Sequence, residues 1–454
     1  MKVTAVLLAA GQGTRMKSSL PKVLHPLCGK PMIWHVLEVL KSAASEKPVV
    51  VVGHGAEEVK KYLGDSANCV LQEPQLGTGH AAMQAESLLT GKTDYVIVTY
   101  ADMPLLRGEI FKRLVETQRL NRGPLSLVTV FSDDPRGFGR ILRKADGTVD
   151  AIVEEYVATP EQRQIKELNV GAYCFKANWL WDALHRIPKN SKKGEYYLTD
   201  VVELAVKDNL PVQAVLHDDF TEAIGINTRV HLSEAEAAMR QRINREHMLN
   251  GVSMMDPAST YIDVGVKIGK DTTVMPNTYI HGSTTIGEGN VIGPNTVIRD
   301  SKIGNRCTVL TSVLEVSTVE DDVDIGPFAR LRKGAHLKSH VHMGNFGEVK
   351  ESTLGEGVKM GHFSYIGDAK IGANTNIGAG TITANFDGEK KNATEIGEDV
   401  FIGVDSMLVA PLKLGDGAQT GAGAIVTKDV AEDTLVVGMP ARAIKKLERR
   451  KKGK

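Results

Sequence analysis

The segment TTIGEGNVIGPNTVIRDSKIG, residues 284–304, places an isoleucine directly before a glycine at Ile286, Ile292 and Ile303. The first two isoleucines are six residues apart, and the third follows after eleven, which is two steps of six with a slip of one. A hexapeptide period is the signature of a parallel β-helix, in which each repeat supplies one short strand and one corner. The aliphatic side chain fills the interior, and the glycine accepts the tight backbone of the corner.

The same six-residue pattern continues through the C-terminal part of the chain. Aliphatic residues precede glycine repeatedly between Ile268 and Leu414, and 28 of the 45 glycines lie after residue 250. A flexible linker is also rich in glycine, but it does not place Ile or Val at every sixth position. We therefore predict a parallel β-helix over residues 251–454, from which the polar segment TITANFDGEKKNAT (381–394) loops outward. The basic end, RAIKKLERRKKGK (442–454), is predicted to be a solvated terminal segment.

Residues 1–228 follow a different pattern, in which short β-rich runs alternate with helical ones. The β-rich runs are VTAVLL (3–8), PVVVVG (48–53), YVIVTY (95–100) and LSLVTV (125–130). The helical patterns include MIWHVLEVLKSA (32–43) and EIFKRLVETQRL (109–120). This alternation predicts an α/β domain with a mostly parallel, Rossmann-like sheet covered by helices. Residues 229–250, rich in Ala, Glu, Arg and Met, are predicted to form a linker helix between the two domains.

The charge balance and the cysteines limit the classes of function. Among 454 residues, 55 Lys and Arg balance 55 Asp and Glu, so no overall field attracts nucleic acid or an anionic membrane. No apolar run approaches the roughly 18 to 20 residues that span a bilayer. The four cysteines are scattered without metal-ligand spacing, as expected for reduced thiols. We expect a cytoplasmic protein that acts on small molecules, with no nucleic-acid or membrane partner.

A glycine-rich turn follows the first predicted strand, in LAAGQGTRM (8–16), and LPKVL (20–24) comes soon after. Such a turn lets backbone amides approach phosphate oxygens, and a helix beginning directly behind it would add its dipole. Arg15 and Lys22 add two cations, which suits a nucleoside triphosphate whose leaving pyrophosphate gains charge. Met16 stands where a dinucleotide-binding motif needs its third glycine, and the P-loop pattern is absent.

Asp102 ends the apolar run YVIVTYAD, at the carboxyl edge of the predicted sheet. A carboxylate there can hold Mg²⁺, and it can equally cap the helix that follows. The residues alone leave both interpretations open.

LAAGQGTRM together with LPKVL resembles the signature of the sugar-nucleotide pyrophosphorylases. The resemblance implies that Arg15 and Lys22 are catalytic, and that Asp102 and Asn227 of AIGINTR hold Mg²⁺. Further matches are VLQEPQLGTGHA (70–81), GFGRI (137–141), AIVEE (151–155) and ELNVG (167–171), and Ala101 stands where a glycine is usual. The substrate-binding residues implied for UTP and the sugar phosphate are Leu8, Ala9, Gly11, Lys22, Gln72, Gly77, Thr78, Tyr100, Gly139, Glu154, Asn169 and Asn227.

Polar side chains are unusually dense along one stretch of the predicted β-helix. There, Arg332 and Lys350 can hold a phosphate, and His362 can act as a general base. The motifs GPFARLR, GNFGEVK, GHFSYIGDA and NIGAGTITANFDG lie between residues 326 and 388. Behind a pyrophosphorylase domain, they resemble the bacterial bifunctional enzymes that acetylate glucosamine-1-phosphate and then join N-acetylglucosamine-1-phosphate to UMP. The resemblance spans nearly the whole chain and implies a left-handed β-helix, a homotrimer with acetyl-CoA bound between subunits, and a product used for cell-wall synthesis.

The resemblance also implies individual roles in acetyl transfer. His362 would take a proton from the 2-ammonium group of the amino sugar so that the free amine attacks the thioester. The residues implied to bind the sugar phosphate are Arg332, Lys350, Tyr365, Asn376 and Lys391. The residues implied to contact acetyl-CoA are Ala379, Asn385, Phe386, Val404, Ala422 and Met439. Val404 departs from the serine that is frequent at its position, and Met439 stands where arginine can occur.

Other hypotheses remain at this point. A pyrophosphorylase could carry a β-helix that only assembles trimers, and the whole chain could be a scaffold without activity. His336, His340 and His342 suggest a metal site, because residues two apart on a strand share a face. The resemblance gives these three histidines no task, which makes the metal site the least favoured of these hypotheses.

Overall fold

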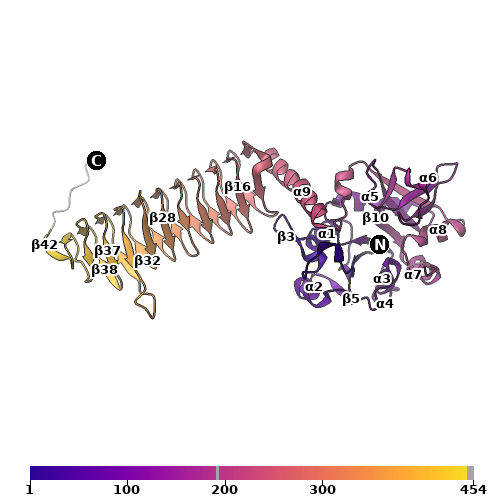
Figure 1. Ribbon diagram of the computed structural model, residues 1–454, viewed down its shortest axis with the longest axis horizontal. Coiled ribbons are helices and arrows are strands. Elements are labelled where there is room, and N and C mark those ends of the chain that lie inside the picture. Colours follow the sequence, from indigo (N-terminus) through magenta and orange to yellow (C-terminus); the bar gives the residue numbers. More distant parts are fainter. Residues whose placement is uncertain (191–193, 447–454) are drawn as a thin grey trace. The chain divides into compact units, whose positions relative to one another are not determined.

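The computed structural model describes residues 1–190 and 194–446, so the end of the predicted solvated tail, residues 447–454, lies outside the described residues. The chain forms two compact units, Met1–Met239 and Arg240–Lys454. The helix α9 (Arg229–Leu249) contributes residues to both. Figure 1 labels the elements of each unit.

The first unit is built on a sheet in the order β11-β7-β10-β6-β1-β4-β5. Strand β1 lies inside it, parallel to β4 and β6, and all its residues are buried. Along this order the predicted mostly parallel sheet is confirmed, because only β10 is antiparallel to its neighbours β6 and β7. The hairpin β8 and β9, which joins the sheet at β10, adds two further antiparallel pairings. The strands of this unit are β1 (Val3–Ala9), β4 (Val49–Val52), β5 (Asn68–Leu71), β6 (Tyr95–Tyr100), β7 (Leu125–Phe131), β10 (Glu167–Lys176), β11 (Val212–His217), the hairpin β8 (Arg140–Arg143) and β9 (Val149–Val153), and the short pair β2 (Pro26–Leu27) and β3 (Lys30–Pro31).

Helices pack on the sheet in two hydrophobic clusters. One contains Val36 of α1, Val59 of α2 and Leu114 of α5, and the other contains Ala82 of α3 and Leu180 of α7. The helical patterns predicted at residues 32–43 and 109–120 are confirmed as α1 and α5. The helices are α1 (Met32–Leu40), α2 (Ala56–Leu63), α3 (Thr78–Met83), α4 (Glu86–Leu89), α5 (Gly108–Leu120), α6 (Pro160–Arg163), α7 (Ala177–Arg186) and α8 (Asp200–Lys207).

The second unit is a parallel β-helix whose coils stack as three ladders of short strands (Figure 1). Equivalent aliphatic residues of successive coils pair in register and fill the interior. One such column runs through Ile262, Ile280, Ile298, Leu314, Leu331, Val349 and Ile366. Each of these side chains is at most 2% exposed. Successive members are 16–18 residues apart, which is three steps of about six, one step for each ladder.

The strands of the β-helix fall into three ladders. The first is β12 (Ser253–Met254), β15 (Thr273–Val274), β18 (Val291–Ile292), β21 (Thr308–Val309), β24 (Asp324–Ile325), β27 (His342–Met343), β30 (Lys359–Met360), β33 (Asn376–Ile377), β36 (Phe401–Ile402), β39 (Gln419–Thr420), β41 (Thr434–Val437) and β42 (Arg442–Lys446). The second is β13 (Thr260–Ile262), β16 (Thr278–His281), β19 (Val297–Arg299), β22 (Val313–Glu315), β25 (Arg330–Leu331), β28 (Gly347–Lys350), β31 (Ser364–Gly367), β34 (Ile382–Ala384), β37 (Met407–Val409) and β40 (Ile425–Val426). The third is β14 (Lys267–Ile268), β17 (Thr285–Ile286), β20 (Lys302–Ile303), β23 (Thr318–Val319), β26 (His336–Leu337), β29 (Thr353–Leu354), β32 (Ala369–Ile371), β35 (Thr394–Ile396) and β38 (Leu412–Leu414).

One local prediction for this unit needs correction, and another is confirmed in the part that the structure describes. The segment TITANFDGEKKNAT does not leave the β-helix as a whole, because Ile382–Ala384 forms strand β34 and only residues 385–393 loop out. Asp387 stabilises that loop by accepting hydrogen bonds from the backbone of Glu389 and Lys390. The described part of the basic tail, Arg442–Lys446, is exposed throughout, as predicted, and it forms strand β42, antiparallel to β41.

None of the helices in the described residues combines the length and the apolar character that crossing a bilayer needs.

Candidate active sites

The glycine turn after β1 brings Lys22 close to the C-terminal end of that strand. A Cβ on Gly11 would meet open space, whereas one on Gly13 (φ +61°) would lie 2.7 Å from the Cβ of Lys22. Gly13 therefore permits Lys22 to pack directly against the turn. The helix expected right behind the turn is absent there, because only the 3₁₀ turn η1 (Thr14–Met16) follows and α1 begins at Met32. A helix dipole at this turn was therefore a wrong prediction.

Lys22 links the two residues predicted to hold a metal. Its Nζ donates to Asp102 Oδ2 at 2.5 Å and to Asn227 Oδ1 at 2.8 Å. Arg15 Nη2 donates to the same Asn227 oxygen at 3.0 Å. The capping interpretation of Asp102 does not hold, because α5 begins only at Gly108 with Arg107 at its N-cap. Two cations and two oxygen acceptors thus converge where β1 and β6 end, at the carboxyl edge of the sheet.

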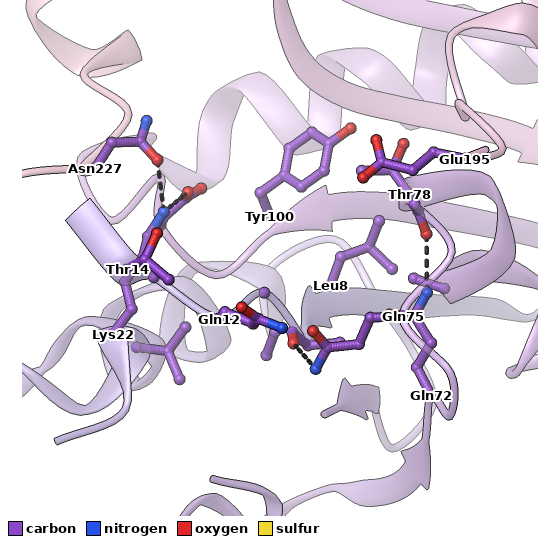
Figure 2. Close-up of a pocket in the computed structure, with 18 of the residues that line it drawn as sticks. Leu8, Gln12, Thr14, Lys22, Gln72, Gln75, Thr78, Tyr100, Glu195 and Asn227 are labelled. Atoms are coloured by element: carbon purple, nitrogen blue, oxygen red, sulfur yellow. Dashed lines mark hydrogen bonds and ion pairs between the residues drawn. The ribbon is translucent and has the colours of Figure 1, made fainter. Parts of the chain in front are cut away.

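Two cavities meet at this cluster. The larger, of about 610 Å³, extends from the glycine turn to Gln72 and Thr78. The smaller, of about 330 Å³, is lined by the second set of predicted residues, Gly139, Glu154 and Asn169. The two cavities share Arg15, Tyr100, Asp102 and Asn227 in their lining. Figure 2 shows Lys22 with Asn227 at one end of the larger cavity and Gln72, Gln75 and Thr78 toward the other.

Tyr100 lines both cavities and packs against Gly171. A Cβ on Gly171 (φ +84°) would lie 2.5 Å from the Tyr100 ring, so only glycine fits there. Burial raises the pKa of the Tyr100 phenol, followed by the neighbouring charge of Glu154. The hydroxyl therefore stays protonated and remains a hydrogen-bond donor.

The far end of the larger cavity is held together by side-chain bonds to the backbone. Gln72 Nε2 donates to the Gly77 carbonyl at 2.9 Å, and Thr78 Oγ1 accepts from the Leu198 amide at 3.0 Å. Gln75 Nε2 donates to the Ala10 carbonyl at 2.8 Å, which fixes this segment against the glycine turn. These contacts hold a set of amide groups that can read the edge of a nucleobase.

The smaller cavity holds a carboxylate and an amide in fixed positions. Thr199 Oγ1 donates to Glu154 Oε1 at 2.9 Å, and Asn169 Nδ2 donates to the Tyr173 hydroxyl at 2.7 Å. Beside them, burial raises the pKa of Asp200 to about 6, helped by the charges of Glu203 and Glu154. A site that offers oriented acceptors and donors of this kind suits a sugar.

The second unit has a cavity of about 670 Å³ on the first ladder. Its floor includes His342, Lys359, Asn376 and Phe401, which pair in this order on neighbouring strands. His362, at the corner after β30, also lines it. The cavity therefore combines imidazole, ammonium and amide groups with apolar side chains such as Phe401, Val404 and Leu435.

A cationic cluster lies beside the second ladder, where Arg332 follows β25, Lys350 ends β28 and Lys391 comes from the outward loop. Arg332 Nη1 donates to Glu348 Oε1 at 2.9 Å, and Lys391 Nζ lies 3.9 Å from Asp368 Oδ2. Lys391 also approaches Lys350, and this contact between like charges lowers the pKa of Lys350. Three cations against two carboxylates give this cluster a net positive charge, which suits a bound anion such as a phosphate.

Comparisons with known proteins identify both units. Residues 5–189 match the MobA-like NTP transferase domain, residues 265–300 the bacterial transferase hexapeptide (six repeats), and residues 394–428 the hexapeptide repeat of succinyl-transferase. The bifunctional protein GlmU of Geobacillus sp. (strain WCH70) is 46% identical over 446 residues, which cover 98% of this chain and 97% of that protein. The GlmU of Listeria monocytogenes serovar 1/2a is 45% identical over 431 residues, 95% of this chain and 94% of that protein.

The chain belongs to the bifunctional GlmU family. It is therefore a bifunctional transferase with a left-handed β-helix: it acetylates glucosamine-1-phosphate with acetyl-CoA and transfers UMP from UTP to N-acetylglucosamine-1-phosphate, giving UDP-N-acetylglucosamine for cell-wall synthesis. Nothing in these matches favours a single-activity pyrophosphorylase or an inactive scaffold.

The residues predicted for uridylyl transfer lie together around the two cavities of the first unit. Those lining the larger cavity are Leu8, Ala9, Gly11, Arg15, Lys22, Gln72, Gly77, Thr78, Tyr100, Asp102 and Asn227. Gly139, Glu154 and Asn169 line the smaller one. Gln75, Glu195 and Tyr197 are among the residues of the larger cavity that sequence reasoning did not assign. Gln75 lies inside the quoted segment 70–81, but nothing in the sequence marked the other two.

The residues predicted for acetyl transfer are divided between two faces of the GlmU-type β-helix. His362, Asn376, Ala379, Val404 and Ala422 line the cavity of the first ladder. Those outside this lining are Arg332, Lys350, Tyr365, Asn385, Phe386, Lys391 and Met439. Of the latter, Asn385 Nδ2 donates to Asp368 Oδ2 and lies 3.5 Å from the Tyr365 hydroxyl, so it belongs to the cationic cluster. Phe386 lies in the outward loop, and Met439 in the turn between β41 and β42.

The histidine metal site finds no support. His336 Nε2 lies 2.8 Å from Glu320 Oε1, and His342 Nδ1 contacts Asp324 Oδ2, each across neighbouring coils. Within residues 1–190 and 194–446, no group of three or more His, Cys, Asp or Glu side chains is arranged to hold a metal ion.

Proposed function

We propose that uridylyl transfer takes place where the two cavities of the first unit meet, and that acetyl transfer takes place on the β-helix around His362. The observation that carries the first assignment is the convergence of Lys22, Arg15, Asp102 and Asn227, three of which line both cavities. We further propose that the protein works in the cytoplasm. Its four cysteines all lie in the described residues and form no disulfide, which suits a reducing compartment.

In the uridylyl-transfer site, UTP would occupy the larger cavity with its uracil at Gln72, Gly77 and Thr78. N-acetylglucosamine-1-phosphate would occupy the smaller one, with its sugar at Glu154 and Asn169. Its phosphate is already ionised, so the attack on the α-phosphorus needs no general base. Positioning and the neutralisation of charge on the leaving pyrophosphate by Lys22 and Arg15 carry the rate.

The oxygen atoms at this site fit Mg²⁺. Asp102 Oδ2 and Asn227 Oδ1 both lie within hydrogen-bond distance of one ammonium group, so they already face a common cationic position. Carboxylate and amide oxygens are hard ligands of the kind that Mg²⁺ prefers. We propose that these two residues hold the ion, which when bound neutralises charge on the phosphate oxygens.

Removal of divalent metal separates the two activities. In excess EDTA, we expect release of pyrophosphate from UTP and N-acetylglucosamine-1-phosphate to fall by at least about 100-fold, since the charge stabilisation at the phosphates is lost. Release of coenzyme A from acetyl-CoA and glucosamine-1-phosphate should stay within about twofold, because His362 chemistry uses no metal. Added Mg²⁺ should restore the first activity. Pyrophosphate release that resists EDTA would rule out the proposed metal.

In the acetyl-transfer site, His362 would accept a proton from the 2-ammonium group, and the free amine would attack the carbonyl carbon of the thioester. As the C–S bond breaks, coenzyme A would leave as the thiolate and take up the second proton that the new amide nitrogen loses, and the proton held by His362 would pass to water. Arg332, Lys350 and Lys391 would bind the sugar phosphate, which would relieve the repulsion between the two lysines. Tyr365 and Asn376 would complete the sugar pocket. Ala379, Val404 and Ala422 line the cavity that acetyl-CoA would enter, and Asn385, Phe386 and Met439 would approach it from outside that lining.

We propose a homotrimer because the acetyl-transfer residues lie on two adjacent faces of the β-helix. A face of one copy and the adjacent face of its neighbour would together form one complete acetyl-transfer site. Hexapeptide repeats of this kind are associated with oligomers. A column of exposed aromatic rings supports this further. Phe328 and Phe346 stack with centroids 5.3 Å apart, and together with Phe363 on the next coil they are 55–59% exposed. An apolar column of this kind on a solenoid is normally covered.

Mass spectrometry tests the complete assignment. With glucosamine-1-phosphate, acetyl-CoA, UTP and Mg²⁺ together, we expect UDP-N-acetylglucosamine, coenzyme A and pyrophosphate. Native mass spectrometry of the same sample should give three times the mass of one chain. If acetyl-CoA stays intact under saturating substrates, the acetyl-transfer assignment is wrong, and a monomer that is fully active would remove the trimer.

A further inference from the structure

We propose that Arg229, the first residue of α9, is a positioning residue that sets the loop carrying both catalytic cations of the uridylyl-transfer site. The inference rests on the function proposed above for that site. It concerns only the first unit, to which residues 1–239 belong.

Arg229 contacts the loop at two points, each close to a catalytic cation. Its Nε donates to the carbonyl of Met16, the residue after Arg15, at 3.3 Å. Its Nη1 lies 3.1 Å from Nδ1 of His25, which follows the 3₁₀ turn that begins at Lys22. His25 is only 3% exposed, and burial together with the Arg229 charge lowers its pKa. The imidazole is therefore neutral, and its Nδ1 can accept a hydrogen bond from the guanidinium N–H.

A third contact comes from the second turn of the same helix. The backbone amide of Cys28 donates to Glu236 Oε2 at 3.0 Å, and the Cys28 thiol lies 3.4 Å from Glu236 Oε1. The start of α9 thus holds the loop at Met16, His25 and Cys28. Asn227 lies two residues before Arg229, so the same chain segment also delivers the amide that meets Lys22 and Arg15.

The Arg229 guanidinium therefore fixes where Arg15 and Lys22 lie relative to Asn227. Arg229 lines neither cavity, so it would act through the loop and not on substrate. A misplacement of catalytic groups by about 1 Å can cost on the order of 100-fold in rate. Because the substrate-reading residues Gln72, Glu154 and Asn169 belong to other segments, we expect kcat to respond more than the KM values.

The test compares three variants of the full-length protein. Arg229→Met keeps the aliphatic stem and should lower kcat for pyrophosphate release at least about 10-fold, with KM for UTP and for the sugar phosphate within about twofold. Arg229→Lys keeps the charge but can satisfy only one of the two acceptors, so its kcat should lie between those of wild type and Arg229→Met. The control, Val230→Ala, changes a neighbouring side chain that is 65% exposed and should behave like wild type.

Coupling between Arg229 and His25 gives the decisive readout. His25→Leu removes the acceptor at similar volume, and the double variant with Arg229→Met should be no slower than Arg229→Met alone within about twofold. If the two losses multiply, Arg229 and His25 act independently and the proposal is wrong. Coenzyme A release in every sample reports on the folding of the β-helix, and the circular dichroism melt reports on the whole chain. Failure of wild type to make UDP-N-acetylglucosamine would refute the proposed function, whereas active wild type with an equally active Arg229→Met would refute only this inference.

Discussion

His362→Ala is expected to abolish acetyl transfer and to leave uridylyl transfer intact. The amino group of glucosamine-1-phosphate is protonated near neutral pH and cannot attack a thioester until a base removes a proton. His362 lines the cavity of the first ladder together with Asn376, and we propose it as that base. We expect coenzyme A release to fall by at least about 1,000-fold, within the range for losing a general base together with its positioned hydrogen bond.

The same protein sample contains its own control for this prediction. When N-acetylglucosamine-1-phosphate is supplied directly, pyrophosphate release by His362→Ala should stay within about twofold of wild type. His340→Asn is the matched control, since His340 is exposed, lies outside the cavity lining and has φ +63°, a conformation that Asn tolerates. Acetyl transfer should survive it. If a folded His362→Ala loses both activities, the division of labour between two sites is wrong.

The fold was largely predictable because a β-helix repeats one physical requirement in every coil. Aliphatic residues at every sixth position had to face inward, and the paired registers place Ile298, Leu331 and Ile366 there. The pattern fails at Thr383, which follows Ile366 in the same column although it is polar. Its hydroxyl accepts from the Gly367 amide at 2.8 Å and donates to the Gly367 carbonyl at 3.0 Å. A satisfied hydroxyl can replace an aliphatic group inside a coil, and periodicity alone cannot reveal this.

The first unit was predictable in its strands and less so in their connections. A buried apolar run indicates a strand but not its direction, which is why the antiparallel β10 was not anticipated. The glycine turn indicated a phosphate site, yet Gly13 serves to admit Lys22 and no helix begins behind it. Glu195 and Tyr197 reach the cavity because their segment pairs with residues 76–79, a tertiary contact without a local sequence signal.

For the β-helix site, the resemblance supplied the residues but not their distribution over the faces. Lys350 and Asn376 are 26 residues apart and lie on different ladders, since β28 belongs to the second and β33 to the first. Insertions that interrupt the six-residue repeat, such as the loop of residues 385–393, change which residues form the corners of each coil. The division over two faces is therefore a structural observation that the motifs did not contain.

Lys22→Ala is expected to lower kcat for uridylyl transfer by at least about 100-fold and to leave acetyl transfer unchanged. Lys22 Nζ bonds both Asp102 and Asn227, so its loss removes a fixed positive charge from the position where the cavities meet. A 100-fold loss corresponds to about 2.7 kcal/mol of transition-state stabilisation, the range measured for one charge-stabilising group. Arg15→Ala should show a loss of the same order, because Arg15 bonds the same Asn227 oxygen.

The loss of kcat in Lys22→Ala should come from the missing positive charge and not from unfolding of the protein. The Asp102 side chain is 24% exposed, so water can solvate it when Lys22 is gone, and the melting temperature should fall by only a few degrees. Lys17→Asn is the matched control, because Lys17 is exposed in the same loop and its left-handed conformation (φ +48°) suits Asn. The rate of pyrophosphate release with UTP, N-acetylglucosamine-1-phosphate and Mg²⁺ all saturating gives kcat. Wild-type turnover by Lys22→Ala would show that Lys22 only anchors the glycine turn, and the charge at the cavity junction would then have to come from Arg15.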